Sequence, residues 1–183
     1  MQTQHGAGYQ LSKPVFFVGF MGSGKTTVSR FLGARYGFRA VDADDYLEQR
    51  SGRIIADIFA EDGEECFRDL ETRCLEKLSS GEPCLVSCGG GVVKREQNVQ
   101  LMRDHGFVVY LRTTAEEAAA RIPDSSSRPL FRNLETARKT LAEREPLYEA
   151  AADASVDTVG RDVSDIAAEV LCILEDNGIA CVE

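Results

Sequence analysis

Residues 19–26 read Gly-Phe-Met-Gly-Ser-Gly-Lys-Thr and fit the phosphate-binding pattern Gly-x-x-x-x-Gly-Lys-[Ser/Thr]. Its glycines let backbone N–H groups turn inward around anionic oxygens, and the start of a following helix adds its positive end. In this pattern Lys25 reaches the β- and γ-phosphates, and the hydroxyl of Thr26 is placed for Mg²⁺. The segment therefore predicts an ATP-phosphate site with Mg²⁺ as cofactor. Its residues are Gly22, Ser23, Gly24, Lys25, Thr26 and Thr27.

Two alternatives bear on this motif. A glycine-rich turn that only caps a helix would look similar over a few residues. A GTPase is expected to carry an Asn-Lys-x-Asp motif for its base, and the sequence contains none. The motif leaves open which group accepts the phosphoryl.

A second group of chemically useful residues is acidic. Asp42, Asp44 and Asp45 follow a short apolar stretch. Near a phosphate site, one carboxylate can order Mg²⁺ through its waters, and another can orient an attacking hydroxyl or accept its proton. The alternative is a helix N-cap, a position that favours Asp, and it suits Asp45 best.

The elements that position these groups follow from hydrophobic patterning. Short apolar runs predict strands at 14–19, 38–41, 84–87, 107–111 and 155–159. Helical spacing predicts helices at 25–36, 54–60, 64–78, 95–105, 115–121, 134–148 and 163–175. This alternation predicts an α/β fold in three layers, with a five-stranded parallel sheet between helices. The glycine-rich loop, the acidic group and a glycine triplet at 89–91 then fall at strand C-termini, where such sheets bind ligands.

The chain divides into a few segments by composition. Residues 1–12 are polar and are expected to be a disordered lead, and residues 13–176 one kinase-like domain. Within it, about 42–80 would bind the acceptor, and 122–133, with two prolines and three serines, would be a mobile lid. Residues 177–183 are expected to fray as a C-terminal tail.

Composition excludes several classes of function. The 183-residue chain has a net charge of −9, which argues against nucleic acid as a partner. Its apolar runs are too short to span a bilayer, and its N-terminus lacks the features of a secretion signal, so we expect a cytoplasmic protein. No heptad pattern demands a partner, so a monomer is expected. Six cysteines without a Cys-x-x-Cys pair favour reduced thiols over a zinc or redox site, with Cys84, Cys88 and Cys172 packing as small apolar residues.

At this point the sequence resembles the shikimate kinase family over its whole expected domain, a family with a nucleoside-monophosphate-kinase-like fold. Each motif after the first is weak alone, but all occur in the family's order and spacing. They are the phosphate loop at 19–26, Val-Asp-Ala-Asp at 41–44, Ile-Ala-Asp-Ile-Phe at 55–59 with Gly63-Glu64 and Phe67-Arg68, the triplet Gly89, Gly90 and Gly91, Arg128-Pro129-Leu130, and Arg-Glu-Pro-Leu-Tyr at 144–148.

The resemblance implies transfer of the γ-phosphoryl of ATP to the 3-hydroxyl of shikimate, giving shikimate 3-phosphate and ADP, a step of aromatic amino acid biosynthesis. Asp44 would hold the ring hydroxyls and act as the base, with Asp42 ordering Mg²⁺ through water. Arg68 and Arg144 would bind the acceptor carboxylate, a task suited to planar guanidinium groups. The glycine triplet would offer backbone N–H groups, with Gly90 at a place where a side chain would block the ring.

Other residues receive roles by the same resemblance. Glu71 would hold the guanidinium of Arg68 through an i,i+3 pair, and Phe59 and Phe67 would wall the ring, although both also suit a core. Arg128 would close with the lid and act in catalysis with Lys25 and Asp44.

The match is thinnest at the base of the nucleotide. Arg121 would flank adenine, but the opposite segment, Gly160-Arg161-Asp162, lacks the proline often found there in the family. Arg132 and Arg138 remain unassigned, and Tyr148 is interpreted as packing.

Two other functions remain possible from sequence. A related small-molecule kinase, such as a gluconate-type enzyme, would use the same phosphate loop with another polyol acid. A nucleotide-binding regulatory module would bind ATP without forming a phosphorylated product, although the paired carboxylates and the arginine-bearing lid count against it.

Overall fold

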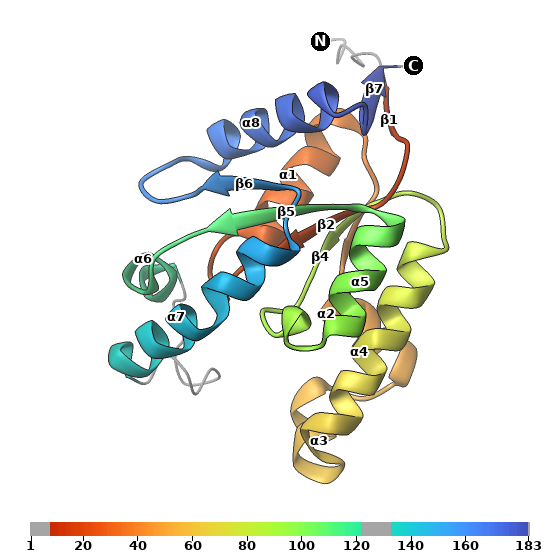
Figure 1. Cartoon of the computed structure of the whole chain (residues 1–183). Coiled ribbons are helices and arrows are strands. Elements are labelled where there is room, and N and C mark those ends of the chain that lie inside the picture. Colours follow the sequence, from red (N-terminus) through yellow and green to blue (C-terminus); the bar gives the residue numbers. More distant parts are fainter. Residues whose placement is uncertain (1–7, 122–132, 183) are drawn as a thin grey trace, which may run out of the picture.

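The computed structural model describes residues 8–121 and 133–182 and shows a parallel sheet between two layers of helices (Figure 1). The sheet has five strands in the order β3-β4-β2-β5-β6, and every neighbouring pair is parallel. Their bounds are β2 Val15–Val18, β3 Ala40–Asp42, β4 Leu85–Ser87, β5 Phe107–Arg112 and β6 Ala154–Asp157. The α/β fold with a five-stranded parallel sheet is therefore confirmed.

The central strand β2 shows why the sheet is covered on both sides. All four of its side chains are buried, and they alternate between two cores. Val15 and Phe17 pack with helices α1 (Lys25–Tyr36) and α8 (Val163–Asp176). Phe16 and Val18 pack with α4 (Gly63–Ser79), α5 (Glu96–His105) and α7 (Leu134–Ala151) on the opposite face (Figure 1).

The first described residues form a strand, so the prediction of a disordered lead is wrong there. β1 (Tyr9–Leu11) pairs antiparallel with β7 (Ala180–Val182), which also corrects the prediction of a frayed C-terminal tail. The ring of Tyr9 lies 5.5 Å from that of Tyr36 and 5.7 Å from that of Phe38, and its hydroxyl donates to Glu175 at 2.7 Å. Residues 1–7 lie outside the described part of the chain. Two three-residue strands that are stable only with a distant partner leave little local signal.

Helix α2 (Ala43–Ser51) was not predicted, and it changes the interpretation of the acidic group. Its N-cap is Asp42, whose Oδ1 accepts from the N–H groups of Asp44 and Asp45 at 3.0 and 3.3 Å. The suggestion that Asp45 is the cap is therefore wrong. The remaining elements are α3 (Ile55–Glu61), the 3₁₀ turn η1 (Val92–Lys94) and α6 (Ala115–Ala120).

The cysteines only partly follow the expectation. Cys84 and Cys88 are buried, as predicted, but Cys172 is exposed on α8, so its assignment to the core is wrong. Burial raises the pKa of the Cys84 and Cys88 thiols, which keeps them protonated and unreactive. None of the helices in residues 8–121 and 133–182 combines the length and the apolar composition that a membrane span requires.

Candidate active site

The phosphate loop connects β2 to α1, and its glycines are required by its shape. Gly22 has a φ of 79°, and a Cβ added there would lie 2.7 Å from the carbonyl oxygen of Ala118. Gly24 is the N-cap of α1 with a φ of 95° and supplies no side chain to cap the helix. The N–H groups of the first turn of α1 are therefore left facing the loop, where an anion can accept from them.

Lys25 lies folded over this loop. Its side chain is buried, and Nζ donates to the carbonyl oxygens of Gly19 and Phe20 at 2.9 Å each. The lysine charge is thus held at the mouth of the phosphate loop by two backbone dipoles. This position suits the predicted contact with the terminal phosphates.

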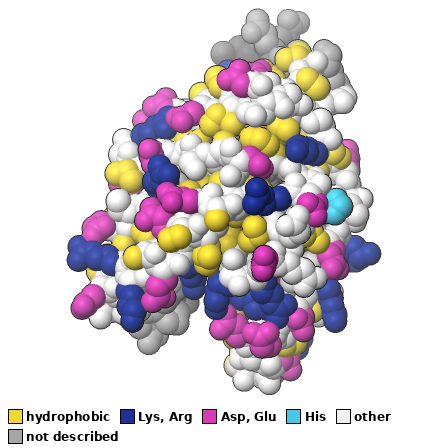
Figure 2. Space-filling model, in the orientation of Figure 1, with side chains coloured by type: hydrophobic (Ala, Val, Ile, Leu, Met, Phe, Trp, Pro, Cys, Tyr) yellow, Lys and Arg dark blue, Asp and Glu magenta, His cyan; other side chains and the backbone are white. Residues whose placement is uncertain are grey.

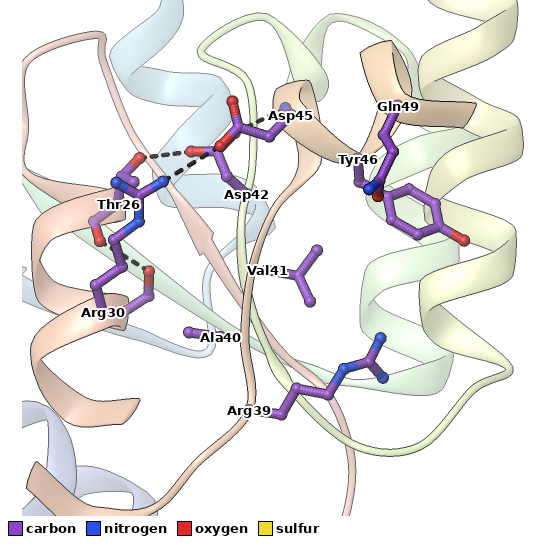
Figure 3. A pocket seen from close by; sticks show the side chains of 10 residues that line it. Thr26, Arg30, Arg39, Ala40, Val41, Asp42, Asp45, Tyr46 and Gln49 are labelled. Atoms are coloured by element: carbon purple, nitrogen blue, oxygen red, sulfur yellow. Dashed lines mark hydrogen bonds and ion pairs between the residues drawn. The ribbon is translucent and has the colours of Figure 1, made fainter. Parts of the chain in front are cut away.

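A cluster of oxygens lies where β2, β3 and β4 end. Thr26 Oγ1 donates to Asp42 Oδ2 at 2.7 Å and lies 3.0 Å from Ser87 Oγ (Figure 3 shows the first contact). Asp42 therefore caps α2 with one oxygen and faces the phosphate loop with the other. A hydroxyl and a carboxylate leave most positions of an octahedral ion to water and phosphate, an arrangement that fits Mg²⁺. Ser87 is a residue that the sequence reasoning missed.

Beside this cluster lies a cavity of about 430 Å³, between α1, β3 and α2 (Figure 3). Thr26 and Asp42 form part of its wall, and the exposed ion pair of Arg30 with Asp45, at 3.2 Å, crosses it. None of the residues expected to bind the acceptor lines it, with Arg68, Arg144 and the glycine triplet all placed elsewhere.

A second set of residues, predicted to bind the acceptor, begins on the first turns of α4. Arg68 is buried, and its Nη1 donates to Glu71 Oε2 at 2.7 Å, which confirms the predicted i,i+3 pair. Glu64 adds a weaker contact to Nη2 at 3.3 Å and also accepts from Lys94, which lowers its pKa. Burial raises the pKa of Glu71, although Arg68 opposes this shift. Across residues 8–121 and 133–182, Glu71 Oε1 is one of the few buried side-chain oxygens without a hydrogen-bond partner.

The glycine triplet lies beside the other residues that the sequence predicts to bind the acceptor. A Cβ added at Gly89 would lie 3.0 Å from Asp44 Oδ1, and one at Gly91 would lie 2.4 Å from Arg68 Nη2. The carbonyl of Gly90 accepts from Arg144 Nη1 at 3.2 Å. Asp44 and the two guanidinium groups thus meet around three consecutive glycines. The position most crowded by protein atoms is Gly91, whereas a Cβ at Gly90 would be no closer than 3.4 Å to its neighbours.

The two phenylalanines differ in their surroundings. Phe67 is buried in a small cluster with Leu47 and Ile58, and the guanidinium of Arg68 lies 5.0 Å from its ring. Phe59 packs on it with ring centroids 4.6 Å apart and is 40% exposed. Phe67 thus packs in the core while touching the guanidinium of Arg68, and Phe59 presents its ring to the outside.

The face drawn in Figure 2 carries a notch between the α3–α4 end and the α6–α7 end of the molecule. Lys and Arg side chains gather beside this notch although the chain as a whole has a net charge of −9. Asp and Glu side chains lie directly beside them, so the notch carries both charges and offers basic groups to an anionic ligand.

On the other side of the phosphate loop lies a cavity of about 380 Å³. Gly22, Gly24 and Thr27 line it together with Arg121 and Arg161. The guanidinium of Arg121 donates to the carbonyl of Thr158 at 2.6 Å and to Glu117 at 2.8 Å. The cavity adjoins the phosphate loop and is lined by Arg121, the arginine expected to flank adenine. Arg161 comes from the segment that lacks the expected proline.

Most of the predicted lid, residues 122–132 with Arg128 and Arg132, lies outside the described part of the chain. Arg138, at the start of α7, forms an ion pair with Glu116 at 2.6 Å, which gives this arginine a contact outside the site.

Comparisons with known proteins point to one family. A model of the family described as shikimate kinase matches residues 21–175. A shikimate kinase of Geobacter metallireducens is 42% identical over 164 residues, which cover 88% of this chain and 91% of that one. One of Dehalococcoides mccartyi is 37% identical over 163 residues, 88% of this chain and 93% of that one.

Solved structures give the same result. The shikimate kinase of Acinetobacter baumannii in complex with shikimate superposes with a TM-score of 0.83 at 33% identity, covering 90% of this chain and 94% of that one. A gluconokinase of Sinorhizobium meliloti reaches a TM-score of 0.60 at 21% identity, covering 92% and 94%, which shows the shared fold alone. The chain therefore belongs to the shikimate kinase family and is an ATP-dependent kinase of shikimate.

Proposed function

We propose that this enzyme transfers the phosphoryl group through the residues that meet between the phosphate loop and the glycine triplet. The observation that carries the proposal is the convergence of Asp44, Arg68 and Arg144 on the triplet. A Cβ added at Gly90 would lie 3.4 Å from the backbone nitrogen of Met21 in the phosphate loop. Donor and acceptor groups bound on the two sides would therefore be neighbours, as direct transfer requires.

Asp44 is the proposed base. It lies in the first turn of α2, at the C-terminal end of β3, with its carboxylate beside Gly89. The 3-hydroxyl of shikimate gives its proton to this carboxylate as its oxygen forms a bond to the γ-phosphorus. The bond from that phosphorus to the bridging oxygen breaks, and ADP leaves with the electron pair. Lys25 stabilises the charge that develops on the phosphates.

Arg68 and Arg144 are proposed to bind the carboxylate of shikimate. Their guanidinium groups lie at neighbouring glycines, so both can donate hydrogen bonds to one carboxylate from different directions. Glu71 holds Arg68 in place, and the backbone N–H groups of the triplet offer further donors. Phe67 supports the guanidinium of Arg68, and the exposed ring of Phe59 is proposed to cover the acceptor ring.

For the nucleotide, we propose Gly22, Ser23, Gly24, Thr26 and Thr27 as phosphate contacts and Arg121 as the adenine neighbour. Thr26, together with Asp42 through water, would hold Mg²⁺. The ion supplies positive charge that offsets the β- and γ-phosphates. The assignment of Arg128 as the lid residue that neutralises charge on the transferring phosphoryl group stays a prediction.

We also propose an oligomeric state and a cellular location. Among the described residues, the large exposed apolar side chains are spread over several elements, such as Ile54 before α3 and Val182 on β7, which favours a monomer. The six cysteines are free thiols, which together with the use of ATP favours the reducing environment of the cytoplasm.

A coupled assay of ADP formation with ATP, Mg²⁺ and either shikimate or gluconate tests the function. We expect turnover that depends on shikimate, with phosphorus NMR placing the product phosphate on the 3-oxygen. Turnover of gluconate but not shikimate would assign the site to another polyol acid. ATP binding without any phosphorylated product would instead support a regulatory module.

A further inference from the structure

Tyr148 makes a contact that the mechanism above does not use. It follows Arg144 by one turn of α7, and its side chain is completely buried. Its hydroxyl donates to the carbonyl oxygen of Gly90 at 2.5 Å, the same oxygen that accepts from Arg144 Nη1 at 3.2 Å. Burial raises the pKa of Tyr148 to about 12, so the phenol remains a donor throughout the neutral range. The earlier interpretation of this tyrosine as a packing residue is therefore incomplete.

The carbonyl of Gly90 belongs to a peptide with few internal restraints. Gly89, Gly90 and Gly91 lack the Cβ atoms that normally limit rotation about the backbone. Within the turn, the N–H groups of Val92 and Lys94 donate to the carbonyls of Gly89 and Gly91, but neither bond holds the carbonyl of Gly90. A hydrogen bond to that carbonyl from outside the turn therefore helps to fix how the peptide between Gly90 and Gly91 is turned. Tyr148 and Arg144 supply two such bonds, both from α7.

The direction of this carbonyl also determines where a donor points. The peptide is trans and planar, so the N–H of Gly91 is directed opposite to the carbonyl of Gly90. Gly91 is buried, yet in residues 8–121 and 133–182 neither its N–H nor that of Gly90 donates a hydrogen bond. Buried backbone donors normally have a partner, so the N–H of Gly91 is suited to a bound ligand, and the half-buried Gly90 offers a second donor beside it in sequence.

We propose that Tyr148 is a positioning residue for the acceptor. Its hydroxyl holds the peptide between Gly90 and Gly91, and through the shared carbonyl also the guanidinium of Arg144, in the orientation that binds shikimate. This inference rests on the proposed role of the triplet and of Arg144 in acceptor binding. It requires that loss of the hydroxyl weakens the use of shikimate while the use of ATP is retained.

The chain offers a matched control in Tyr110 of β5. The two rings stack with centroids 5.2 Å apart and an interplanar angle of 27°, and both side chains are fully buried. Within the described residues, however, the Tyr110 hydroxyl has no hydrogen-bond partner. Tyr148→Phe and Tyr110→Phe thus remove the same atom from neighbouring places in the same core, but only the first breaks a contact to the triplet.

Steady-state kinetics of the whole enzyme, with ATP and shikimate varied separately, tests the proposal. For Tyr148→Phe we expect the KM for shikimate to rise about tenfold, which corresponds to one hydrogen bond, with the KM for ATP unchanged within twofold. Tyr110→Phe is expected to keep both constants within twofold. Calorimetric titration with shikimate should show the same weakening as a change in dissociation constant.

Three results would overturn the proposal. Tyr148→Phe could keep the wild-type KM for shikimate, it could raise both KM values equally, or Tyr110→Phe could have the same effect. Should Tyr148→Phe fold poorly, Tyr148→4-aminophenylalanine keeps a donor in the same place and is expected to recover shikimate binding, whereas failure to recover it contradicts the role of the hydroxyl. Turnover of shikimate by the wild-type enzyme in the same assay tests the proposed function separately.

Discussion

Replacing Gly91 with alanine is expected to push the guanidinium of Arg68 out of place. An added Cβ would lie 2.4 Å from Arg68 Nη2 and 2.8 Å from its Cζ and Nη1, whereas ordinary contacts begin at 3.4 Å. The difference between 3.4 and 2.4 Å requires a movement of about 1 Å. The backbone itself accepts alanine, because Gly91 has a φ of −103°. The effect of Gly91→Ala should thus be purely one of collision.

The size of the effect follows from what Arg68 contacts. A shift of about 1 Å breaks the 2.7 Å hydrogen bond to Glu71, and a hydrogen bond to a charged group contributes about 1.5–3 kcal/mol. For a chain of this size, Tm should fall by roughly 3–12 °C. Misplacing a substrate-binding group by 1 Å lowers activity by about 100-fold, so kcat/KM for shikimate should fall by that factor. The KM for ATP should stay unchanged, because the collision lies on the acceptor side.

Thermal unfolding of Gly91→Ala, Arg68→Ala and the double variant tests the collision directly. Without the guanidinium there is nothing to collide with, so Gly91→Ala should destabilise the Arg68→Ala protein by at least about 1 kcal/mol less than it destabilises the wild type. Equal destabilisation in both backgrounds would refute the reasoning. So would a Gly91→Ala enzyme with wild-type kcat/KM for shikimate.

Three further substitutions test other parts of the site. Lys25→Ala should lower kcat by about 100- to 1,000-fold, because a charge that stabilises the transition state is lost, and near-normal turnover in the ADP assay would contradict this role. Asp44→Asn should reduce kcat strongly with the dissociation constant of ATP unchanged within threefold; a selective loss of ATP binding, measured by calorimetry, would reassign the residue to the metal. Glu71→Gln tests the raised pKa of a buried carboxyl. The pKa of Glu71 in the folded protein exceeds its usual value of 4.5, so Glu71 contributes its full stability below pH 4.5. This contribution is lost as the pH rises through the pKa of the folded protein. The Tm of the wild type relative to Glu71→Gln should therefore fall as pH is raised from 4 to 8, and a difference that is constant or grows with pH would contradict the shift.

The phosphate loop and the sheet were predictable because their signals are local. The motif at 19–26 specifies both its shape and its ligand, and the helix predicted at 25–36 has the bounds of α1. The pair of Arg68 with Glu71 was also within reach, since it depends only on helical spacing. By contrast, α2 was missed because its hydrophobic pattern is weak and its stability depends on Asp42 as a cap.

The contacts that sequence reasoning missed join distant segments. Tyr148 meets the carbonyl of Gly90 across 58 positions, and Thr26 meets the hydroxyl of Ser87 across 61. β1 and β7 similarly depend on each other from opposite ends of the chain. Residue types at these positions are compatible with many roles, so only the folded arrangement singles out the right one.

At the proposed acceptor site, the pair of Arg68 and Glu71 serves geometry more than stability. Arg68 and Glu71 form a hydrogen-bonded pair at 2.7 Å, yet desolvation outweighs this attraction and the pKa of Glu71 is still raised. Oε1 of Glu71 has no partner within the described residues, which adds to the penalty for burying the charge. A neutral side chain at position 71 would thus be the better choice for folding alone. The carboxyl group of Glu71 is explained by what it does to Arg68, because it holds a guanidinium against Gly91 where the carboxylate of shikimate is expected to bind.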